Sequence, residues 1–514
     1  MDRILEYLKK EREKEWRVEL RGKMKTKERT SLERLDMPES DPNVRNKSYI
    51  EVNKGLSVEQ AMHEAHRCID CPKPTCIEGC PVGINIPKFI KKIEAGEFLE
   101  SAKVLKETNA LPAVCGRVCP QEVQCEQACF YTQKLGKPPV AIGNLERFAA
   151  DYERNSGQIS IPEISSRNGI KVASIGSGPS GLAFAGDMIK MGYDVTVFEA
   201  LHEIGGVLKY GIPEFRLPND IVDVEIEILR KMGVKFVTNF IVGKTATIDD
   251  LKKEGYTAFF VGSGAGLPNF MNIPGENLIG IYSSNEYLTR VNLMRAADPE
   301  YDTPVISGKK VAVIGGGNTA MDSVRTAKRL GAEKAMIIYR RSIEEMPARN
   351  EEIKHAQEEG IEFLNLNSPL EYFADENGRV NKMKLQKMKL GEPDNSGRRR
   401  PIPIKGSEYF IDVDTVIVSV GVSPNPLIPR SMKELDVSNW GTIQVNKDSL
   451  QSSVSDVFAG GDIVRGGATV ILAMGDGRMA AAGMNKYIKE KVRNIISLVK
   501  EFNTIGDILD FATK

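Results

Sequence analysis

The stretch "IKVASIGSGPSGLAFAGDMIKMGYDVTVFEA", residues 170–200, decides the fold of this chain of 514 residues. It predicts a short apolar strand, a glycine-rich turn, a helix and a second strand. In the turn, Gly176 permits a tight bend, Gly178 allows a pyrophosphate to approach the backbone, and Gly181 lets the helix pack on the strand. Glu199 ends the second strand, where a carboxylate accepts hydrogen bonds from a ribose. We therefore predict a dinucleotide site here; a βαβ unit without a ligand is the alternative.

The same pattern recurs in "KKVAVIGGGNTAMDSVRTAKRLGAEKAMIIYRR", residues 309–341. Its turn carries Gly315, Gly317 and Ala320, which is a GxGxxA motif. The second strand ends in Arg340 and Arg341, where the first unit has a carboxylate. A carboxylate would repel a 2′-phosphate, whereas a guanidinium group binds one with charge-assisted bonds. We predict that this second site binds NADP(H); a solvated strand end is the alternative for the two arginines.

Three further segments belong to these nucleotide domains. Residues 256–266 and 413–425 are apolar strands closed by glycine turns, and we expect them to be the crossovers between the two domains. The stretch at 455–481 places Asp462 after a Gly-Gly turn and predicts a helix after Thr469. A helix N-terminus beside a flavin ring would stabilise negative charge on the reduced ring. We interpret Asp462 as a flavin-binding residue; an ordinary turn residue is the alternative.

All eight cysteines lie in two runs, "CIDCPKPTCIEGC" at 68–80 and "CGRVCPQEVQCEQAC" at 115–129. Disulfides fit poorly in a reducing cytosol. Zinc sites built from four thiolates use paired CxxC units, and only Cys68 and Cys71 have that spacing. Closely spaced cysteines that end in Cys-Pro, as at Cys80 and Cys119, are typical of iron–sulfur proteins. We predict two 4Fe–4S clusters, with disulfides and structural zinc as the alternatives.

Composition excludes several classes of function. The 70 basic and 70 acidic residues cancel, so we expect no nucleic-acid or anionic-membrane partner. No apolar run approaches the roughly 18 residues of a membrane span. The start lacks the apolar core of a signal peptide, and we predict a cytoplasmic protein. We find no nucleophile elbow, Walker or kinase motif and no catalytic histidine pair, so we assign no catalytic side chain. Redox chemistry would belong to the cofactors.

The predicted fold class is an α/β flavoprotein with two Rossmann-like dinucleotide-binding domains and an N-terminal α-helical iron–sulfur domain. The polar segment 155–169 reads as the linker between the helical and nucleotide-binding parts. We interpret the charged residues 1–30 as a solvated helix or a frayed arm. The expected boundaries are 1–160 for the helical domain, 168–282 and 426–514 for the FAD domain, and 283–425 for the NADP(H) domain.

Several motifs together resemble a known family. They include "HRCIDCPKPTCIEGCPV", "CGRVCP", "AIGNLERF", "GGVLKYGIPEFRLP", "YRRSIEEMPA" and "FAGGDIVRGGATV", besides the two glycine turns. From about residue 45 to 490, the chain resembles the small (β) subunit of NADPH-dependent glutamate synthase. It is also similar to the N-terminal half of dihydropyrimidine dehydrogenase and to the large subunit of NADH-dependent ferredoxin:NADP oxidoreductase.

The resemblance implies a specific set of ligands. One cluster would take three cysteines of the first run and the last of the second: Cys68, Cys71, Cys76 and Cys129. The other would take three cysteines and an oxygen ligand: Cys80, Cys119, Cys125 and Glu146. Cys115 would lie near a cluster without binding it. FAD would lie at Gly176, Gly178, Gly181, Glu199, Gly206, Leu208, Asp462 and Thr469. NADP(H) would lie at Gly315, Gly317, Asn318, Thr319, Arg340 and Arg341.

The function that the resemblance implies is electron transfer. Electrons would pass from NADPH to FAD as a hydride and then singly through the two clusters to an acceptor. The expected partner is a glutamate synthase large subunit, or another electron-accepting subunit, and we expect an oligomer. The alternatives are the flavin and iron–sulfur subunit of a ferredoxin:NADP oxidoreductase, sulfide dehydrogenase-like, and a non-catalytic electron relay.

Overall fold

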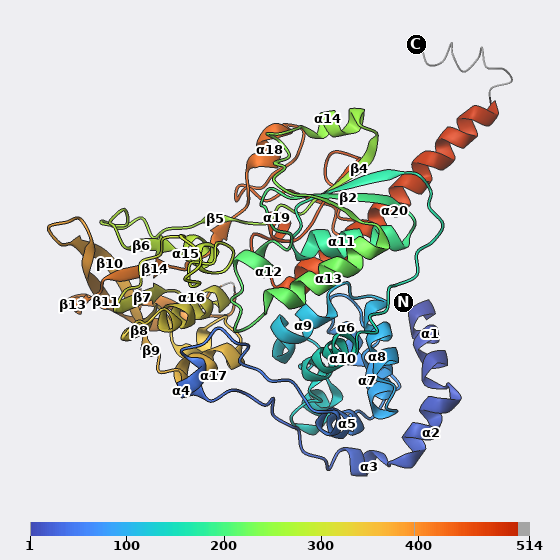
Figure 1. Ribbon diagram of the computed structural model, residues 1–514, viewed down its shortest axis with the longest axis horizontal. Helices are drawn as coiled ribbons and strands as arrows, with labels where there is room; N and C mark the ends of the chain where they lie inside the picture. The colour runs from blue at the N-terminus through green and yellow to red at the C-terminus, as the bar shows by residue number, and fades with distance from the viewer. Residues whose placement is uncertain (1, 395, 502–514) are drawn as a thin grey trace.

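The computed structural model describes residues 2–394 and 396–501 and contains three bodies (Figure 1). A helical domain lies at the bottom of the view, and two α/β domains lie above it and to its left. This arrangement confirms the predicted fold class. Residues 502–514 of the expected last segment lie outside the described residues.

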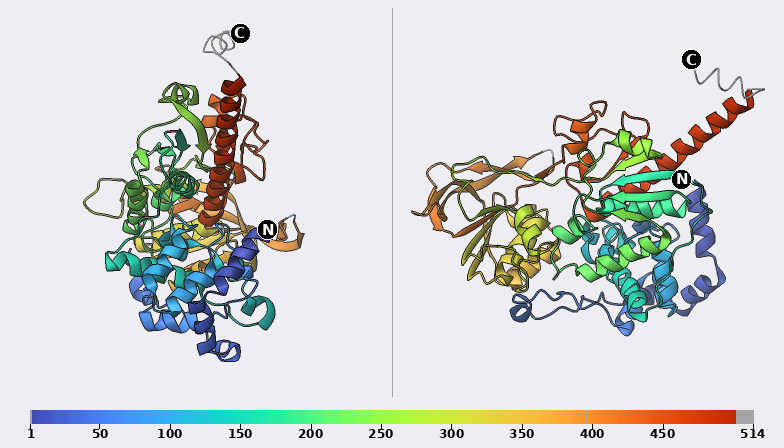
Figure 2. Two further views of the ribbon diagram at one scale, coloured as in Figure 1. Left: turned by 90° about the vertical axis from the view of Figure 1, so that its right-hand side faces the viewer. Right: turned by 45° about the horizontal axis from the view of Figure 1, so that its top comes forward.

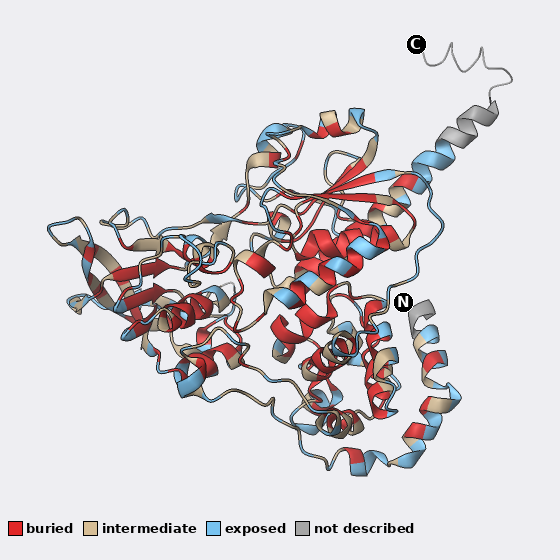
Figure 3. Ribbon diagram, viewed as in Figure 1, coloured by how far each residue is buried: buried red, intermediate tan, exposed pale blue. Residues whose placement is uncertain are grey.

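The first α/β domain is built on five parallel strands in the order β16–β4–β1–β2–β3. Parallel neighbours require crossover connections, and α11 (Pro179–Lys190) provides the one between β1 and β2. Helix α11 is buried almost throughout, between this sheet, α13 (Asn219–Met232) and the long α20 (Val470–Glu501) (Figure 3). The strands are β1 Lys171–Ile175, β2 Asp194–Phe198, β3 Lys235–Val237, β4 Tyr256–Val261 and β16 Val457–Ala459.

The second α/β domain repeats this plan with five parallel strands in the order β6–β14–β7–β8–β9. Helix α16 (Asn318–Arg329) connects β7 to β8, and α15 (Ser284–Val291) packs against α16. The strands are β6 Ile281–Ser283, β7 Lys310–Ile314, β8 Lys334–Tyr339, β9 Glu362–Asn365 and β14 Thr415–Val418. An antiparallel sheet extends this domain: β10 Asn367–Ala374, β11 Val380–Pro393, β12 Arg399–Pro403 and β13 Tyr409–Asp412.

The chain passes between the two domains through a pair of short strands. Strand β5 (Leu267–Pro268) leaves the first domain and pairs antiparallel with β15 (Val422–Ser423), which returns to it. Both crossovers therefore lie directly after the apolar strands that predicted them. Because β6 pairs with β14, the second sheet begins before residue 283, and the expected boundary there falls inside this sheet.

The helical domain is held together by one apolar core that includes Phe89, Leu105, Val114 and Leu145, each fully buried. Ser57 caps the first of these helices, because its hydroxyl accepts a hydrogen bond from Gln60 N at 3.2 Å. The helices are α5 Val58–Arg67, α6 Thr75–Glu78, α7 Ile86–Glu94, α8 Phe98–Lys106, α9 Pro112–Val118 and α10 Ile142–Ser156. Two shorter helical segments span Gln121–Val123 and Tyr131–Leu135.

The N-terminal segment corrects the expectation of a solvated or frayed arm. Helices α1 (Asp2–Arg12), α2 (Glu15–Lys23) and α3 (Thr26–Arg29) run along the helical domain and bury Arg17 and Leu20 against it. The arginines of the segment find buried acidic partners, which the balanced composition did not indicate.

The chain next crosses to the second α/β domain, where α4 (Pro42–Arg45) lies beside α17 (Asn350–Glu358) (Figure 1). There Arg45 Nε lies 3.1 Å from Glu359 Oε1, and both side chains are buried. At the other end of the chain, α20 projects away from the body of the molecule (Figure 2). Among the described helices, none is both long and apolar enough to cross a membrane.

Candidate functional site

The first glycine turn has the geometry that its motif predicts. Gly176 has φ +103°, and a Cβ there would lie 2.5 Å from Gly262 O. A Cβ on Gly181 would lie 2.1 Å from Gly176 O, so α11 can pack this closely only with glycine. A Cβ on Gly178 would meet no atom within 4 Å, which leaves space at the N-terminus of α11. That space, with helix N–H groups directed at it, fits a pyrophosphate.

A second turn closes over the first. Gly206 has φ +56°, and a Cβ there would lie 2.9 Å from Gly178 Cα. Leu208 follows in α12 (Val207–Tyr210), and its side chain is fully buried in the core. Ser263 Oγ, beside the first turn, is buried and has no hydrogen-bond partner among the described residues. The two turns and this unpaired hydroxyl fit the phosphate-bearing part of FAD.

Glu199 lies directly after β2 and is held in place by the glycine turn. Its carboxylate accepts hydrogen bonds from Ser177 N at 2.9 Å and from Leu201 N at 2.9 Å, and it also accepts from Ser177 Oγ. Burial, and then the charges of Asp462 and Glu199, raise the pKa of the Tyr210 phenol to about 12. Sequence reasoning missed Ser177, although it is the variable residue between two motif glycines.

Asp462 and Thr469 lie where the first domain closes. Asp462 begins α19 (Asp462–Arg465) after Gly461, whose φ is +76°, and burial raises the pKa of its carboxyl to about 6. Thr469 precedes α20, and its hydroxyl accepts a hydrogen bond from Leu472 N at 3.4 Å, so the expected helix is confirmed. The buried Asp476 holds this turn, accepting from Gly461 N at 2.9 Å. Sequence reasoning missed Asp476 because its partners lie on another segment.

The second glycine turn opens into a cavity of about 640 Å³. Gly315 has φ +143°, and a Cβ there would lie 2.3 Å from Ser419 O. A Cβ on Gly317 would again meet no atom within 4 Å. Gly315, Gly317 and Thr319 line the cavity. Asn318 is not among the lining residues; its side chain instead accepts a hydrogen bond from Arg349 N at 2.9 Å.

The two predicted arginines occupy different environments. Arg340 is exposed at the cavity, whereas Arg341 is buried and its guanidinium lies 2.6 Å from Asp394 Oδ2. Arg341 Nε also donates to Arg399 O at 2.8 Å. The connection between β11 and β12 brings Arg398 to the same cavity. Sequence reasoning gave Arg398 no function. The one local signal for it is the run of three arginines at 398–400.

A second cavity, of about 880 Å³, adjoins the first. It reaches Gly466 and Gly467, which lie between Asp462 and Thr469. Four residues in or directly after the interdomain strands line both cavities: Pro268, Asn269, Phe270 and Val422. The open space therefore runs from the second glycine turn to the turn that closes the first domain.

The cysteines form two groups, each drawn from both runs. In the first cysteine group, burial raises the pKa of Cys71 to about 12, and the neighbouring Cys68 and Cys129 add to this shift. The pKa of Cys76 lies well above its usual value through burial and the charges of the same thiols. The structure thus brings together four cysteines: Cys68, Cys71, Cys76 and Cys129.

The second cysteine group surrounds a buried carboxyl. Burial raises the pKa of Glu146 to about 8, although Asn109 Nδ2 donates to it at 2.8 Å. Burial raises the pKa of Cys80, burial and the charge of Glu126 raise that of Cys125, and a hydrogen bond with Cys115 together with burial raises that of Cys119; the charge of Glu146 adds to all three shifts. Cys115 lies beside Cys119. The second cysteine group is Cys80, Cys119, Cys125 and Glu146.

The spacing of the thiols disfavours a single metal ion. Zinc thiolates at about 2.3 Å from the ion lie within about 4 Å of one another. Among the described residues, the one set of three or more ligand atoms within 4.8 Å is Glu39, His355 and Glu358, which contains no cysteine. All eight cysteines are free thiols. Wider groups of four donors fit an iron–sulfur cluster, in which each cysteine binds a different iron.

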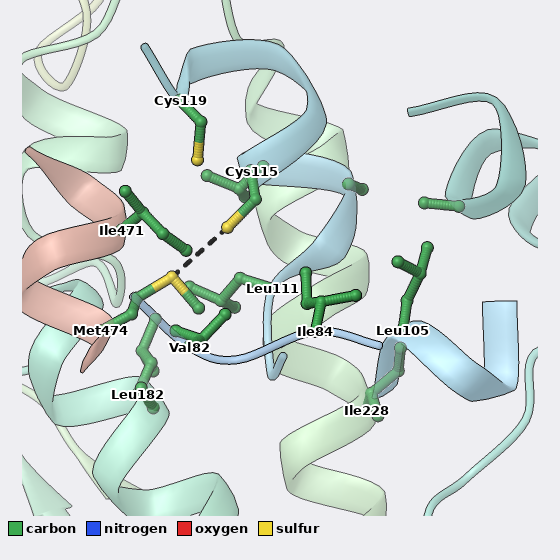
Figure 4. Close-up of a cluster of buried hydrophobic side chains, with 14 of the residues drawn as sticks. Val82, Ile84, Leu105, Leu111, Cys115, Cys119, Leu182, Ile228, Ile471 and Met474 are labelled. Atoms are coloured by element: carbon green, nitrogen blue, oxygen red, sulfur yellow. Dashed lines mark hydrogen bonds between the residues drawn. The ribbon is translucent and has the colours of Figure 1, made fainter. Parts of the chain in front are cut away.

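Helix α20 passes close to Cys115 and Cys119 (Figure 4). Met474 lies one turn after Thr469, and its Sδ is 3.5 Å from Cys115 Sγ. A Cβ on Gly475 would lie 3.0 Å from Pro81 O, so the helix passes directly against the residue after Cys80. Ile471, Leu111 and Leu182 surround this contact and exclude water. Sequence reasoning missed Met474, which has no motif of its own.

Two family models match the chain. Residues 45–158 match the dihydropyrimidine dehydrogenase domain II family, described as a 4Fe-4S cluster domain. Residues 170–477 match the pyridine nucleotide-disulphide oxidoreductase family. Helices α1–α3 precede the first match.

Named relatives extend over most of the chain. The glutamate synthase [NADPH] small chain of Escherichia coli is 37% identical over 466 residues, which cover 89% of this chain and 98% of the relative. The NADP(+)-dependent formate dehydrogenase subunit beta of Moorella thermoacetica is 38% identical and covers 81% of this chain and 60% of the relative. The structure of Mycobacterium tuberculosis FprA in complex with NADPH, at 19% identity, has a TM-score of 0.53 and covers 67% of this chain and 89% of that chain. At this identity it shows the fold alone.

Proposed function

This chain belongs to the family of the NADPH-dependent glutamate synthase small chain, and we propose that it supplies electrons for glutamate synthesis by a partner subunit. It is an NADPH-dependent oxidoreductase whose cofactors are FAD, NADP(H) and iron–sulfur. The observation that carries the proposal is one continuous arrangement. The cavity at the second glycine turn adjoins a second cavity that reaches the turn before α20, and Met474 of α20 contacts Cys115.

Each domain has a defined task in this proposal. Gly317 and the N-terminus of α16 bind the pyrophosphate of NADPH, and Arg340 binds its 2′-phosphate. Gly178, Gly206 and the N-terminus of α11 hold FAD, with Glu199 on its ribose. Bound FAD supplies the conversion from two-electron to one-electron transfer. The chain's own residues set the distances: α20 holds the flavin side against the second cysteine group.

The ligand assignment is part of the proposal. The first and second cysteine groups each hold one 4Fe–4S cluster, and Glu146 is the single oxygen ligand. Cys115 packs against Met474 without binding iron. The test is Glu146→Ala against Cys115→Ser in the full chain, read by EPR. We expect Glu146→Ala to change one cluster's signal and Cys115→Ser to leave both. The reverse result would restore a ligand set of eight cysteines.

The partner is tested by reconstitution. Anaerobic NADPH should bleach the visible flavin band of the isolated chain, and a chain that does not bleach would be a relay without nicotinamide turnover. Adding the glutamate synthase large subunit from the same genome should then make NADPH oxidation depend on glutamine and 2-oxoglutarate. Bleaching without that dependence would favour another acceptor, as in a ferredoxin:NADP oxidoreductase. The mass of the complex would test the expected oligomer.

A further inference from the structure

Asp70 occupies an unusual place in the loop of the first cysteine group. It lies between Cys68 and Cys71, is fully buried and has φ +51°. A non-glycine residue in this left-handed region needs compensating contacts. A buried carboxylate also needs a positive partner, because water is excluded. Asp70 therefore depends on whatever surrounds it.

Its partners come from helices α1 and α2 at the start of the chain. Arg17 and Arg21 both pair with the Asp70 carboxylate, Arg21 Nη1 at 2.8 Å from Oδ2. Arg12 Nε donates to the Asp70 backbone oxygen at 2.8 Å. Arg17 is 2% exposed and Asp70 0%, so their ion pair is shielded from solvent. Glu13 also pairs with Arg12 at 2.7 Å and with Arg21 at 3.5 Å, so three guanidinium groups face two carboxylates and leave one unbalanced positive charge beside the loop.

A second buried group of charges lies on the other side of Cys68. Lys91 Nζ donates to Cys68 O at 2.5 Å, and Arg29 Nη1 donates to His66 O at 2.8 Å. Both cations share the carboxylate of Glu94, which Arg29 Nη2 contacts at 2.7 Å. Both groups of buried charges therefore lie directly beside the Cys68–Cys71 loop.

We propose that Arg17 and Arg21 are positioning residues for the cluster of the first cysteine group, which fix the Cys68–Cys71 loop through Asp70 and raise the reduction potential of that cluster. The inference rests on the proposed function, because it requires a cluster at these cysteines. Reduction adds negative charge, which a nearby cation stabilises and a nearby anion destabilises. Net charge and solvent exposure are among the factors that set cluster potentials.

The sign of the effect distinguishes charge from packing. In the full-length protein, Asp70→Asn removes an anion and should raise the potential of the first cluster. Asparagine also tolerates the left-handed conformation. The double variant Arg17→Gln with Arg21→Gln removes two cations and should lower the same potential. An anaerobic redox titration followed by EPR measures the reduction potentials of both clusters in one sample. The potential of the second cluster should not change.

A chelator assay tests the positioning role separately. Arg17→Lys with Arg21→Lys keeps the charge but loses the forked geometry of guanidinium. It should leave the potential near that of the unaltered protein but release iron from one cluster faster, by about tenfold, as is typical when a supporting contact is lost. Lys103→Gln is the matched control, because Lys103 pairs with Glu100 on the exposed face of α8. It should change neither quantity.

Shifts of the same sign in Asp70→Asn and the glutamine double variant, or no shift in either, would overturn the proposal. If the glutamine variant does not fold, Asp70→Asn and the lysine variant still decide it. An unaltered protein that contains no iron would instead refute the proposed function. The two failures are therefore distinguishable.

Discussion

In the first dinucleotide-binding unit the strand after the glycine turn ends at Glu199, and in the second it ends at Arg340 and Arg341. The backbones of the two units are alike, with one glycine at positive φ and one with open space above it in each turn. The surroundings differ. Glu199 is fixed by its own turn through Ser177, whereas Arg341 is paired with Asp394 on a distant strand connection. The local pattern sets where a nucleotide can lie, and the neighbours of the strand end set which nucleotide it is.

The largest effect is expected at the third position of the two turns. Gly181→Ala places a Cβ 2.1 Å from Gly176 O, and neither backbone segment can move easily. We therefore expect the free energy of unfolding to fall by about 3 kcal/mol. The matched change in the second unit is Ala320→Gly, because that buried position already carries a methyl group. It should cost about 1–2 kcal/mol, from helix propensity and a lost methyl contact. Thermal unfolding checks both, and a larger loss from Ala320→Gly would contradict the packing role of Gly181.

Substitutions of the middle glycines, Gly178 and Gly317, should each affect the binding of a different cofactor. Gly178→Ala and Gly317→Ala meet no protein atom, so both variants should fold. The first should purify with little FAD, since its methyl group would occupy pyrophosphate space. The second should keep FAD and bind NADP⁺ about tenfold more weakly, or about 1.4 kcal/mol. Flavin absorbance and a nucleotide titration measure the two. Equal FAD loss in both variants would mean that the turns do not serve separate nucleotides.

The charges at the cavity should decide between NADPH and NADH. Arg340→Ala and Arg398→Ala should each raise KM for NADPH by about tenfold, because a charge-assisted bond is lost at a partly solvated site. KM for NADH should change little. Glu199→Gln is the control, which should alter FAD retention but not the nucleotide preference. Equal effects on both nucleotides would remove the phosphate-binding role of either arginine.

The smallest effect is expected at the partner of Arg341. Asp394→Asn removes the carboxylate that competes with a 2′-phosphate for this guanidinium, and NADPH should bind about twofold more tightly, or about 0.4 kcal/mol. A titration with NADP⁺ and NAD⁺ measures the difference. Weaker binding of NADP⁺ would show instead that Asp394 is needed to hold Arg341 in position.

Much of the fold was predictable because its instructions are local. The glycine motifs are surrounded by strands and a helix within about 30 residues, so the turn, its helix and its strand order follow from adjacent sequence. The helix after Thr469 was predicted for the same reason. The boundary expected at residue 283 falls inside strand β6, because β6 joins its sheet by pairing with β14, which is more than 130 residues away.

The functional sites, like the fold, were predictable where the signal lies in adjacent residues and not where it depends on contacts between distant segments. The sequence alone determined that this chain holds two nucleotide turns and two cysteine runs, because steric freedom at glycine and the chemistry of thiols belong to the residues themselves. Only the tertiary structure decided that Arg341 is bound by Asp394, that Met474 contacts Cys115, and that Arg17 supports Asp70. Each of these contacts joins segments 53 to 359 residues apart. Their partners are chosen by how whole domains pack, and no spacing within a motif records that choice.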